Sequence, residues 1–227
     1  MEMFTKIKLR NILLLLFLLF SIVDVNYAQL SCILIDNPAL KTAYMNPLNI
    51  PTDVSIPKTV RVNIHFILRS NGTGNFTETT DIYNVQNSYN GYWFANKVIE
   101  QCNYWLDRNQ EMTQQLSCCP IPVEPINYRY TLAGVFFDKN DTYFNNQGIH
   151  TNLIKNGSDV INVLVYPNAS GNGSAYLGGN ICWQNGAQKA YDNYLLYGDW
   201  GIYGVISLGI NHEVGHCLSL EHCKRYA

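Results

Sequence analysis

Residues 212–222 read His-Glu-Val-Gly-His-Cys-Leu-Ser-Leu-Glu-His. On a helix, side chains four positions apart lie on one face, so His212 and His216 can direct their imidazole nitrogens at a single metal ion. Zinc binds imidazole ligands at about 2.0 to 2.1 Å. Glu213 is rotated away from the metal axis and can reach a water molecule on the open coordination position. His222 completes a three-histidine site if the helix ends promptly and the chain turns back.

The same segment has a second interpretation, as a buried helix whose histidines form hydrogen bonds within a protein core. Residues 202–219 are apolar around the polar side chains, so we expect this helix to be buried. Burying three histidines and a glutamate is costly without a metal or strong partners, which favours the metal site. Cys217 follows His216 and points to another face of the helix, so we expect a disulfide or a buried thiol there and not a zinc ligand.

Hydrophobic periodicity predicts the elements that precede this helix. The even positions of residues 60–68 are apolar, and the polar Arg61, Asn63 and His65 fall between them, which predicts a half-buried strand with His65 on its solvent-facing side. Residues 70–90 are rich in Asn, Gly and Thr and are expected to form a loop. Apolar residues at spacings of three and four then predict a long amphipathic helix over 94–106.

Three further strands are predicted between that helix and the histidine motif. They cover residues 128–137, 160–166 and 174–177. The second is an apolar run that contains one polar residue, Asn162, and is typical of a central strand that is covered on both faces. The third is short and bracketed by glycines, so we expect it at an edge of the sheet. Strands and helices in this order predict an α/β domain with a final buried helix.

The first 28 residues have the pattern of a secretory signal peptide. Basic residues are followed by an apolar run over residues 12–23 and by Ala28, near which we expect cleavage. The run is too short for a membrane-spanning helix, so we expect a secreted or extracytoplasmic protein with no membrane anchor after cleavage. The remainder is expected to be an N-terminal extension, residues 29–58, and one catalytic domain, residues 59–227.

Charge and cysteine content narrow the class of protein further. The chain has 15 Lys and Arg against 17 Asp and Glu, and this balance gives no indication of a nucleic-acid partner. All seven cysteines follow the predicted signal peptide, which makes disulfides the default expectation, with at least one thiol left over. They are Cys32, Cys102, Cys118, Cys119, Cys182, Cys217 and Cys223.

The histidine motif resembles that of the metzincin zinc metalloproteases, in particular the pappalysin and cytophagalysin branch, whose pattern reads H-E-x-G-H-x-x-G-L-x-H. The matching positions are His212, Glu213, Gly215, His216, Leu220 and His222. Ser219 stands where the pattern has a glycine that turns the chain with positive φ. A serine held in that conformation costs about 1 to 2 kcal/mol. A weaker similarity extends to the strand around His65, the long helix, residues 161–163 and residues 173–177, which are similar to the family's edge strand.

The resemblance implies a zincin-like fold: a twisted mixed sheet with an edge strand for substrate, a long backing helix and an active-site helix. It implies a zinc-dependent endopeptidase with Glu213 as general base. A polypeptide substrate would lie antiparallel along the edge strand, at Ser174, Ala175, Tyr176 and Leu177. The family also has a methionine-containing turn and a substrate pocket after the third histidine, so we expect this C-terminal subdomain to be missing from a chain that ends at Ala227.

Two alternatives to an active peptidase stay open at the level of sequence. One is a secreted binding protein of the same fold that has lost catalysis, which the short C-terminus favours and the intact Glu213 disfavours. The other is a structural surface protein with accidental histidines. Within the peptidase hypothesis, the thiol of Cys32 is a further candidate for a ligand that blocks the zinc.

Overall fold

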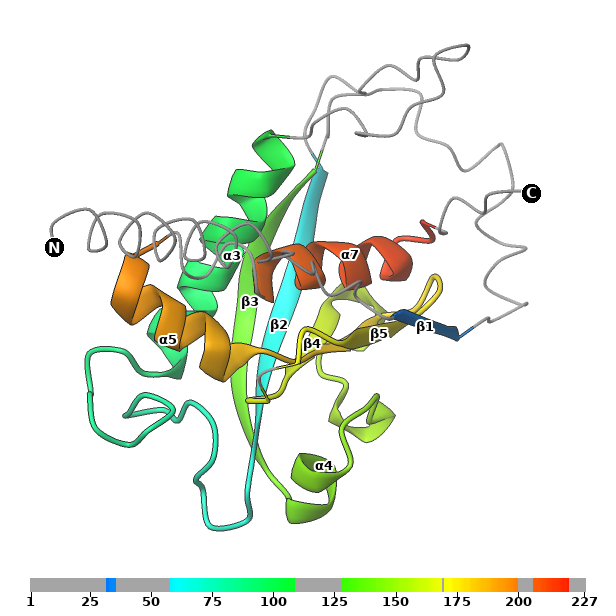
Figure 1. Ribbon diagram of the computed structural model, residues 1–227. Coiled ribbons are helices and arrows are strands. Elements are labelled where there is room, and N and C mark those ends of the chain that lie inside the picture. Colours follow the sequence, from blue (N-terminus) through cyan, green and yellow to red (C-terminus); the bar gives the residue numbers. More distant parts are fainter. Residues whose placement is uncertain (1–31, 36–57, 109–127, 169, 200–205, 221–227) are drawn as a thin grey trace, which may run out of the picture.

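A mixed six-stranded β-sheet forms the centre of the molecule (Figure 1). Helices cover one face of the sheet, and a segment that connects two of its strands covers the other. The computed structural model describes residues 58–108, 128–168, 170–199 and 206–220, and it describes the backbone of residues 32–35. The strands are β1 (Cys32–Ile35), β2 (Lys58–Leu68), β3 (Tyr128–Lys139), β4 (Ile161–Val165), β5 (Gly173–Tyr176) and β6 (Ile181–Gln184). The helices are α3 (Gly91–Asp107), α4 (Asp141–Asn145), α5 (Ala187–Tyr197) and α7 (Leu208–Cys217), with 3-10 turns at Thr151–Leu153 and Gly157–Asp159. The α/β class is therefore confirmed.

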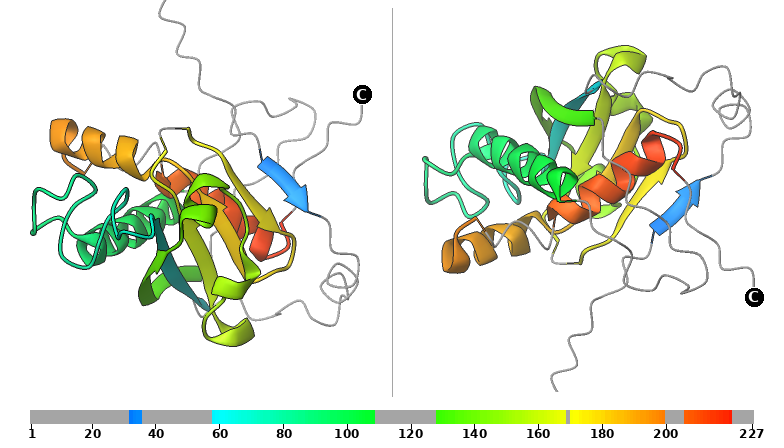
Figure 2. Two further views of the ribbon diagram at one scale, coloured as in Figure 1. Left: turned by 90° about the horizontal axis from the view of Figure 1, so that it is seen from below. Right: turned by 90° about the horizontal axis from the view of Figure 1, so that it is seen from above.

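The strands follow the order β1-β5-β6-β4-β2-β3. β5 runs antiparallel to β6, whereas every other neighbouring pair in the described sheet is parallel. The prediction of an edge strand at 174–177 is wrong in its position, because β1 pairs with the outer side of β5 and becomes the edge (Figure 2). β1 comes from the predicted N-terminal extension. Pairing between segments so far apart in sequence depends on the tertiary fold, which local periodicity does not report.

Both faces of the sheet are covered. On one face α3, α5 and α7 pack over the even-numbered residues of β2, such as Ile64 and Phe66, and form the larger core. On the other face the connection from 140 to 160 covers the odd-numbered residues and forms a smaller core around Ile67, Leu164 and Tyr166. β4 is buried at every position, as predicted for a doubly covered strand.

The burial of β2 corrects one sequence-based prediction. His65 is 0% exposed, so its assignment to the solvent-facing side is wrong. The alternation of apolar and polar residues in β2 is real, but the polar face lies beneath the segment that contains α4 and the two 3-10 turns. Alternation predicts two different faces and does not show that the polar one is open to water.

Local sequence explains the long helix. The side chain of Asn90 accepts a hydrogen bond from the backbone N–H of Trp93, a standard N-cap that begins α3 at Gly91. The predicted helix at 94–106 lies within α3, and residues 70–90, all described, contain no helix or strand. β6 and α5 were not predicted, because their residues follow neither a long helical nor a strict alternating pattern.

The ends of the predicted organisation fall outside the described residues. The predicted signal peptide, residues 1–28, is among them, and so is His222. α7 lies within the apolar segment at 202–219, of which residues 202–205 are likewise not described. Within the described part of the chain, no helix is both long and apolar enough to cross a membrane.

Candidate metal centre

α7 brings two of the three predicted zinc ligands together. The Nε2 atoms of His212 and His216 lie 3.2 Å apart, and the two rings are nearly perpendicular at 86°. The Nδ1 atom of His216 lies 2.5 Å from the carbonyl oxygen of Leu220. A carbonyl only accepts, so Nδ1 donates, and the neutral ring then carries its lone pair on Nε2. His216 therefore has the tautomer that a zinc ligand needs, oriented by a backbone carbonyl as metal-binding histidines usually are.

The distance between the two nitrogens fits a zinc ion. Two imidazole nitrogens bound at about 2.0 to 2.1 Å in tetrahedral geometry are separated by about 3.3 Å. The observed 3.2 Å agrees with this separation. No group of three His, Cys, Asp or Glu side chains is placed to hold a metal within the residues that the structure describes. The third predicted ligand, His222, lies beyond residue 220, the last one described near this helix, so the complete ligand set stays a prediction.

The turn that follows α7 adopts the conformation expected of the family's glycine. Ser219 has a φ of 70°, in the left-handed region. The N–H of Leu220 donates to the carbonyl of Gly215, and the N–H of Ser219 donates to the carbonyl of His216, each at 2.9 Å. These two bonds define a Schellman motif. The helix therefore ends promptly, and the reversal brings the carbonyl of Leu220 to the ring of His216, which is the first condition for His222 to approach the metal.

Glu213 lies on the side of α7 that faces β5. Its side chain is 0% exposed. A Cβ atom placed on Gly173, the first residue of β5, would lie 2.7 Å from Oε1 of Glu213 and 2.6 Å from Oε1 of Gln184. The candidate general base can lie against the strand only because residue 173 has no side chain.

Gln184 is a neighbour of this site that sequence reasoning missed. Its Nε2 donates to the carbonyls of Gly171 and Asn185, each at 3.1 Å, so its amide oxygen is directed toward Gly173. The same amide lies against Gly209 in the first turn of α7, where an added Cβ would come within 2.4 Å of it. Gln184 thus fills the space between the start of β5 and the start of α7. Its strand was not predicted, so no sequence signal identified it.

The residues of the predicted substrate strand lie beside the histidine helix. Ser174, Ala175 and Leu177 are buried, and Tyr176 is half-buried. Leu177 follows the end of β5, and the N–H of Gly178 then donates to the carbonyl of His216 at 2.9 Å. The turn after β5 is therefore attached directly to the candidate metal ligand. The outer backbone edge of β5, where the substrate was expected, is paired with β1.

Three cysteine side chains are described, and all three are free and buried: Cys102, Cys182 and Cys217. The Sγ of Cys217 donates to the carbonyl of Ile181 at 3.6 Å, which confirms a buried thiol at this position. The neighbouring Cys217 thiol, together with burial, raises the pKa of Cys182, and burial raises the pKa of Cys102. Disulfides among the other four cysteines stay a prediction.

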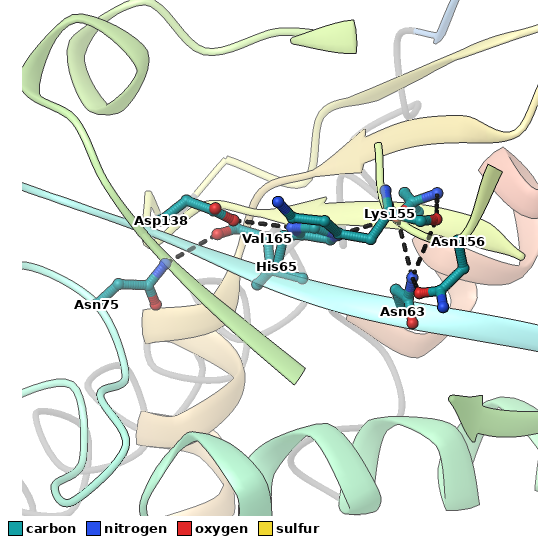
Figure 3. Close-up of polar contacts among 8 residues, drawn as sticks. Asn63, His65, Asn75, Asp138, Lys155, Asn156 and Val165 are labelled. Atoms are coloured by element: carbon teal, nitrogen blue, oxygen red, sulfur yellow. Dashed lines mark hydrogen bonds and ion pairs between the residues drawn. The ribbon is translucent and has the colours of Figure 1, made fainter. Parts of the chain in front are cut away.

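A second polar cluster lies on the opposite face of the sheet from α7 (Figure 3). His65 Nδ1 is 2.8 Å from Oδ2 of Asp138, and its Nε2 is 3.0 Å from Oδ1 of Asn162. Oδ1 of Asn162 also accepts from the backbone N–H of Lys155, which identifies it as the oxygen. Both ring nitrogens thus face oxygen atoms of neighbouring strands. The cluster joins β2, β3 and β4 and is separate from the metal centre.

Comparison with known proteins adds no assignment to this geometry. The chain matches no protein-family model and no curated protein sequence. The functional conclusion therefore depends on the residues of α7, β5 and β6 and on their contacts.

Proposed function

We propose that the chain is a secreted zinc-dependent endopeptidase of the metzincin kind, in which His212, His216 and His222 hold the metal and Glu213 is the general base. The observation that carries the proposal is the pair of imidazole Nε2 atoms 3.2 Å apart, with the His216 tautomer fixed by the Leu220 carbonyl. The mixed sheet and the long α3 are features that the resemblance to metzincins led us to expect, and they support the proposal.

The chain's own residues can each be given a task in peptide hydrolysis. Zinc, when bound, supplies a Lewis acid that polarises the scissile carbonyl and lowers the pKa of its water toward about 7. Glu213 would take the proton of that water and pass it to the leaving amine. Its position against Gly173 puts it beside β5, whose backbone groups would align an extended peptide by strand addition. A polypeptide is therefore the proposed substrate.

Substitution of Glu213 tests this mechanism without knowledge of the natural substrate. Glu213→Ala should leave zinc content near one ion per chain, because the carboxylate is not a ligand, and should lower casein cleavage at least about 100-fold. Glu78→Ala, which changes an exposed glutamate in the 70–90 loop, is the matched control and should alter neither quantity. Equal cleavage by the wild type and Glu213→Ala would disprove the assigned role, and a zinc-free wild type after gentle purification would disprove the metal site.

The alternative is a secreted binding protein of the same fold without catalysis. The observation that favours it is the pairing of β1 with the strand that a substrate would use. This alternative would be supported if the protein binds zinc but cleaves no member of a broad peptide library, whether β1 is paired with β5 or released from it.

A further inference from the structure

The amide of Gln184 occupies the space between α7 and the hairpin formed by β5 and β6. The residue is fully buried, at 0% exposed. Its Nε2 donates one proton to the carbonyl of Gly171 and the other to the carbonyl of Asn185. These two bonds fix the orientation of the amide, and they leave it no proton to donate to a neighbouring carboxylate.

Two glycines allow the amide to lie close to both α7 and Glu213. A Cβ atom on Gly209, in the first turn of α7, would lie 2.4 Å from Oε1 of Gln184 and 2.5 Å from its Cδ. A Cβ atom on Gly173 would lie 2.6 Å from the same Oε1, 2.7 Å from Oε1 of Glu213 and 2.9 Å from Cγ of Glu213. The side chains of Glu213 and Gln184 therefore share one closely packed space between β5 and α7.

The oxygen of the Gln184 amide is a buried acceptor that has no hydrogen-bond donor among the described residues. The two carbonyls account for the NH2 group, but they do not account for the oxygen. Buried polar atoms without a partner are rare in folded proteins and are expected mainly at functional sites. A carboxylate oxygen and an amide oxygen repel each other, so this atom limits how far the carboxylate of Glu213 can turn toward β6.

We infer that Gln184 is a positioning residue, which keeps the carboxylate of Glu213 from turning back into the space between β5 and β6. The carboxylate then stays within reach of the open coordination position on the metal. The inference rests on the proposed peptidase function and adds to it a residue that acts only through Glu213. Because its side chain is fully buried, Gln184 contacts neither metal nor substrate.

A small displacement of the general base has a large effect on the rate. The base must lie within about 2.6 to 3.2 Å of the group whose proton it takes. A displacement of about 1 Å in a catalytic geometry can lower the rate about 100-fold. Without the amide of Gln184, the carboxylate gains space of that size on its β6 side. The position of Glu213 affects the chemical step, so kcat should fall while KM and zinc content stay near those of the wild type.

Gln184→Ala removes the amide and tests its effect on Glu213 directly. For a fluorogenic casein peptide, kcat should fall at least about tenfold, with KM and zinc content unchanged. In the zinc-free protein, the NMR signal of the Glu213 carboxyl carbon should shift relative to the wild type. Gln188→Ala, at an exposed glutamine of α5, is the matched control and should change none of these quantities.

A second variant keeps both hydrogen bonds of Gln184 and therefore separates its position from its contribution to folding. Gly209→Ala places a Cβ against the amide and displaces it toward Glu213, while alanine favours the helix. It should lower kcat and shift the same NMR signal. In the Glu213→Ala background, however, Gln184→Ala should leave the residual cleavage rate unchanged, because no carboxylate remains to be positioned.

The outcomes distinguish this inference from the proposed function. An unchanged kcat and an unchanged NMR signal in both Gln184→Ala and Gly209→Ala would overturn the positioning role, while cleavage by the wild type would still support the peptidase. An equal loss of rate with and without Glu213 would also overturn it, since a merely structural residue acts in both backgrounds. If the wild type cleaves no peptide, the peptidase function fails, and the role of Gln184 toward a general base fails with it.

Discussion

Ser219 offers a measurable test of the turn that shapes the candidate metal centre. Its φ of 70° lies in the region that glycine adopts at little cost, and it is the residue at which the Schellman motif reverses the chain. Its Oγ atom is also buried without a hydrogen-bond partner among the described residues. Both features disfavour serine, so Ser219→Gly should stabilise the protein.

The size of the gain follows from three contributions. A residue with a Cβ in the left-handed conformation costs about 1 to 2 kcal/mol, which glycine avoids. Removing a buried, unsatisfied hydroxyl contributes about 1 kcal/mol more. Glycine loses more backbone entropy on folding, which opposes these gains by about 0.5 to 1 kcal/mol. The free energy of unfolding should therefore rise by about 1 to 2 kcal/mol, and each kcal/mol raises Tm by about 2 to 4 °C in a domain of this size.

Urea denaturation and thermal unfolding of the zinc-free protein measure this gain directly. Ser219→Ala removes the hydroxyl and keeps the Cβ, so it should recover only the smaller, hydroxyl part. Ser158→Gly changes an exposed serine without positive φ, and should lower stability by up to about 1 kcal/mol. A loss of stability in Ser219→Gly, or an equal gain in Ser158→Gly, would refute the argument that the left-handed turn is strained.

Two further substitutions test the neighbourhood of the site and the opposite face of the sheet. Gly173→Ala places a Cβ within 2.7 Å of the side-chain oxygens of Glu213 and Gln184. It should therefore lower casein cleavage at least about tenfold with zinc content unchanged. Gly148→Ala is the control and should be neutral, because an added Cβ at Gly148 meets nothing within 4 Å. His65→Ala leaves the half-buried carboxylate of Asp138 without its imidazole partner and removes one of the partners of the buried Asn162 amide, so it should lower the free energy of unfolding by about 2 to 3 kcal/mol. His150→Ala, at a half-exposed ring, should cost under about 1 kcal/mol. Equal losses at the two histidines, measured by urea denaturation, would contradict the structural role of His65.

Local patterns predicted the parts of the fold that local physics determines. The amphipathic spacing in α3 and the largely apolar run in β4 each predict burial, and both elements form where these patterns occur. The i, i+4 spacing of His212 and His216 likewise predicted their convergence, because helix geometry alone brings the two rings together. These predictions needed no information about the rest of the chain.

Contacts between distant segments could not be predicted in this way. The covered polar face of β2, the pairing of β1 with β5 and the placement of Gln184 against Gly173 all depend on which segments meet in three dimensions. His65 shows the difference most clearly. Its alternation with apolar residues correctly predicted a polar face of the strand. The hydrogen-bond partners that compensate for its burial, however, lie on β3 and β4. Hydrophobic periodicity shows which residues share a face of the strand, but it does not show which other segment of the chain covers that face.

The contacts of His216 connect the turn, the strand and the candidate metal ligand in one unit. Its backbone carbonyl accepts from Ser219 N–H and from Gly178 N–H, each at 2.9 Å, and its ring donates to the carbonyl of Leu220. The capping turn therefore fixes the ring from one side, while the turn after β5 fixes the backbone from the other. The hydrogen bond from Gly178 therefore links the position of β5 directly to that of His216. Ser219 belongs to the same unit, so the cost of its left-handed conformation is located next to His216, whose Nε2 faces the candidate metal site.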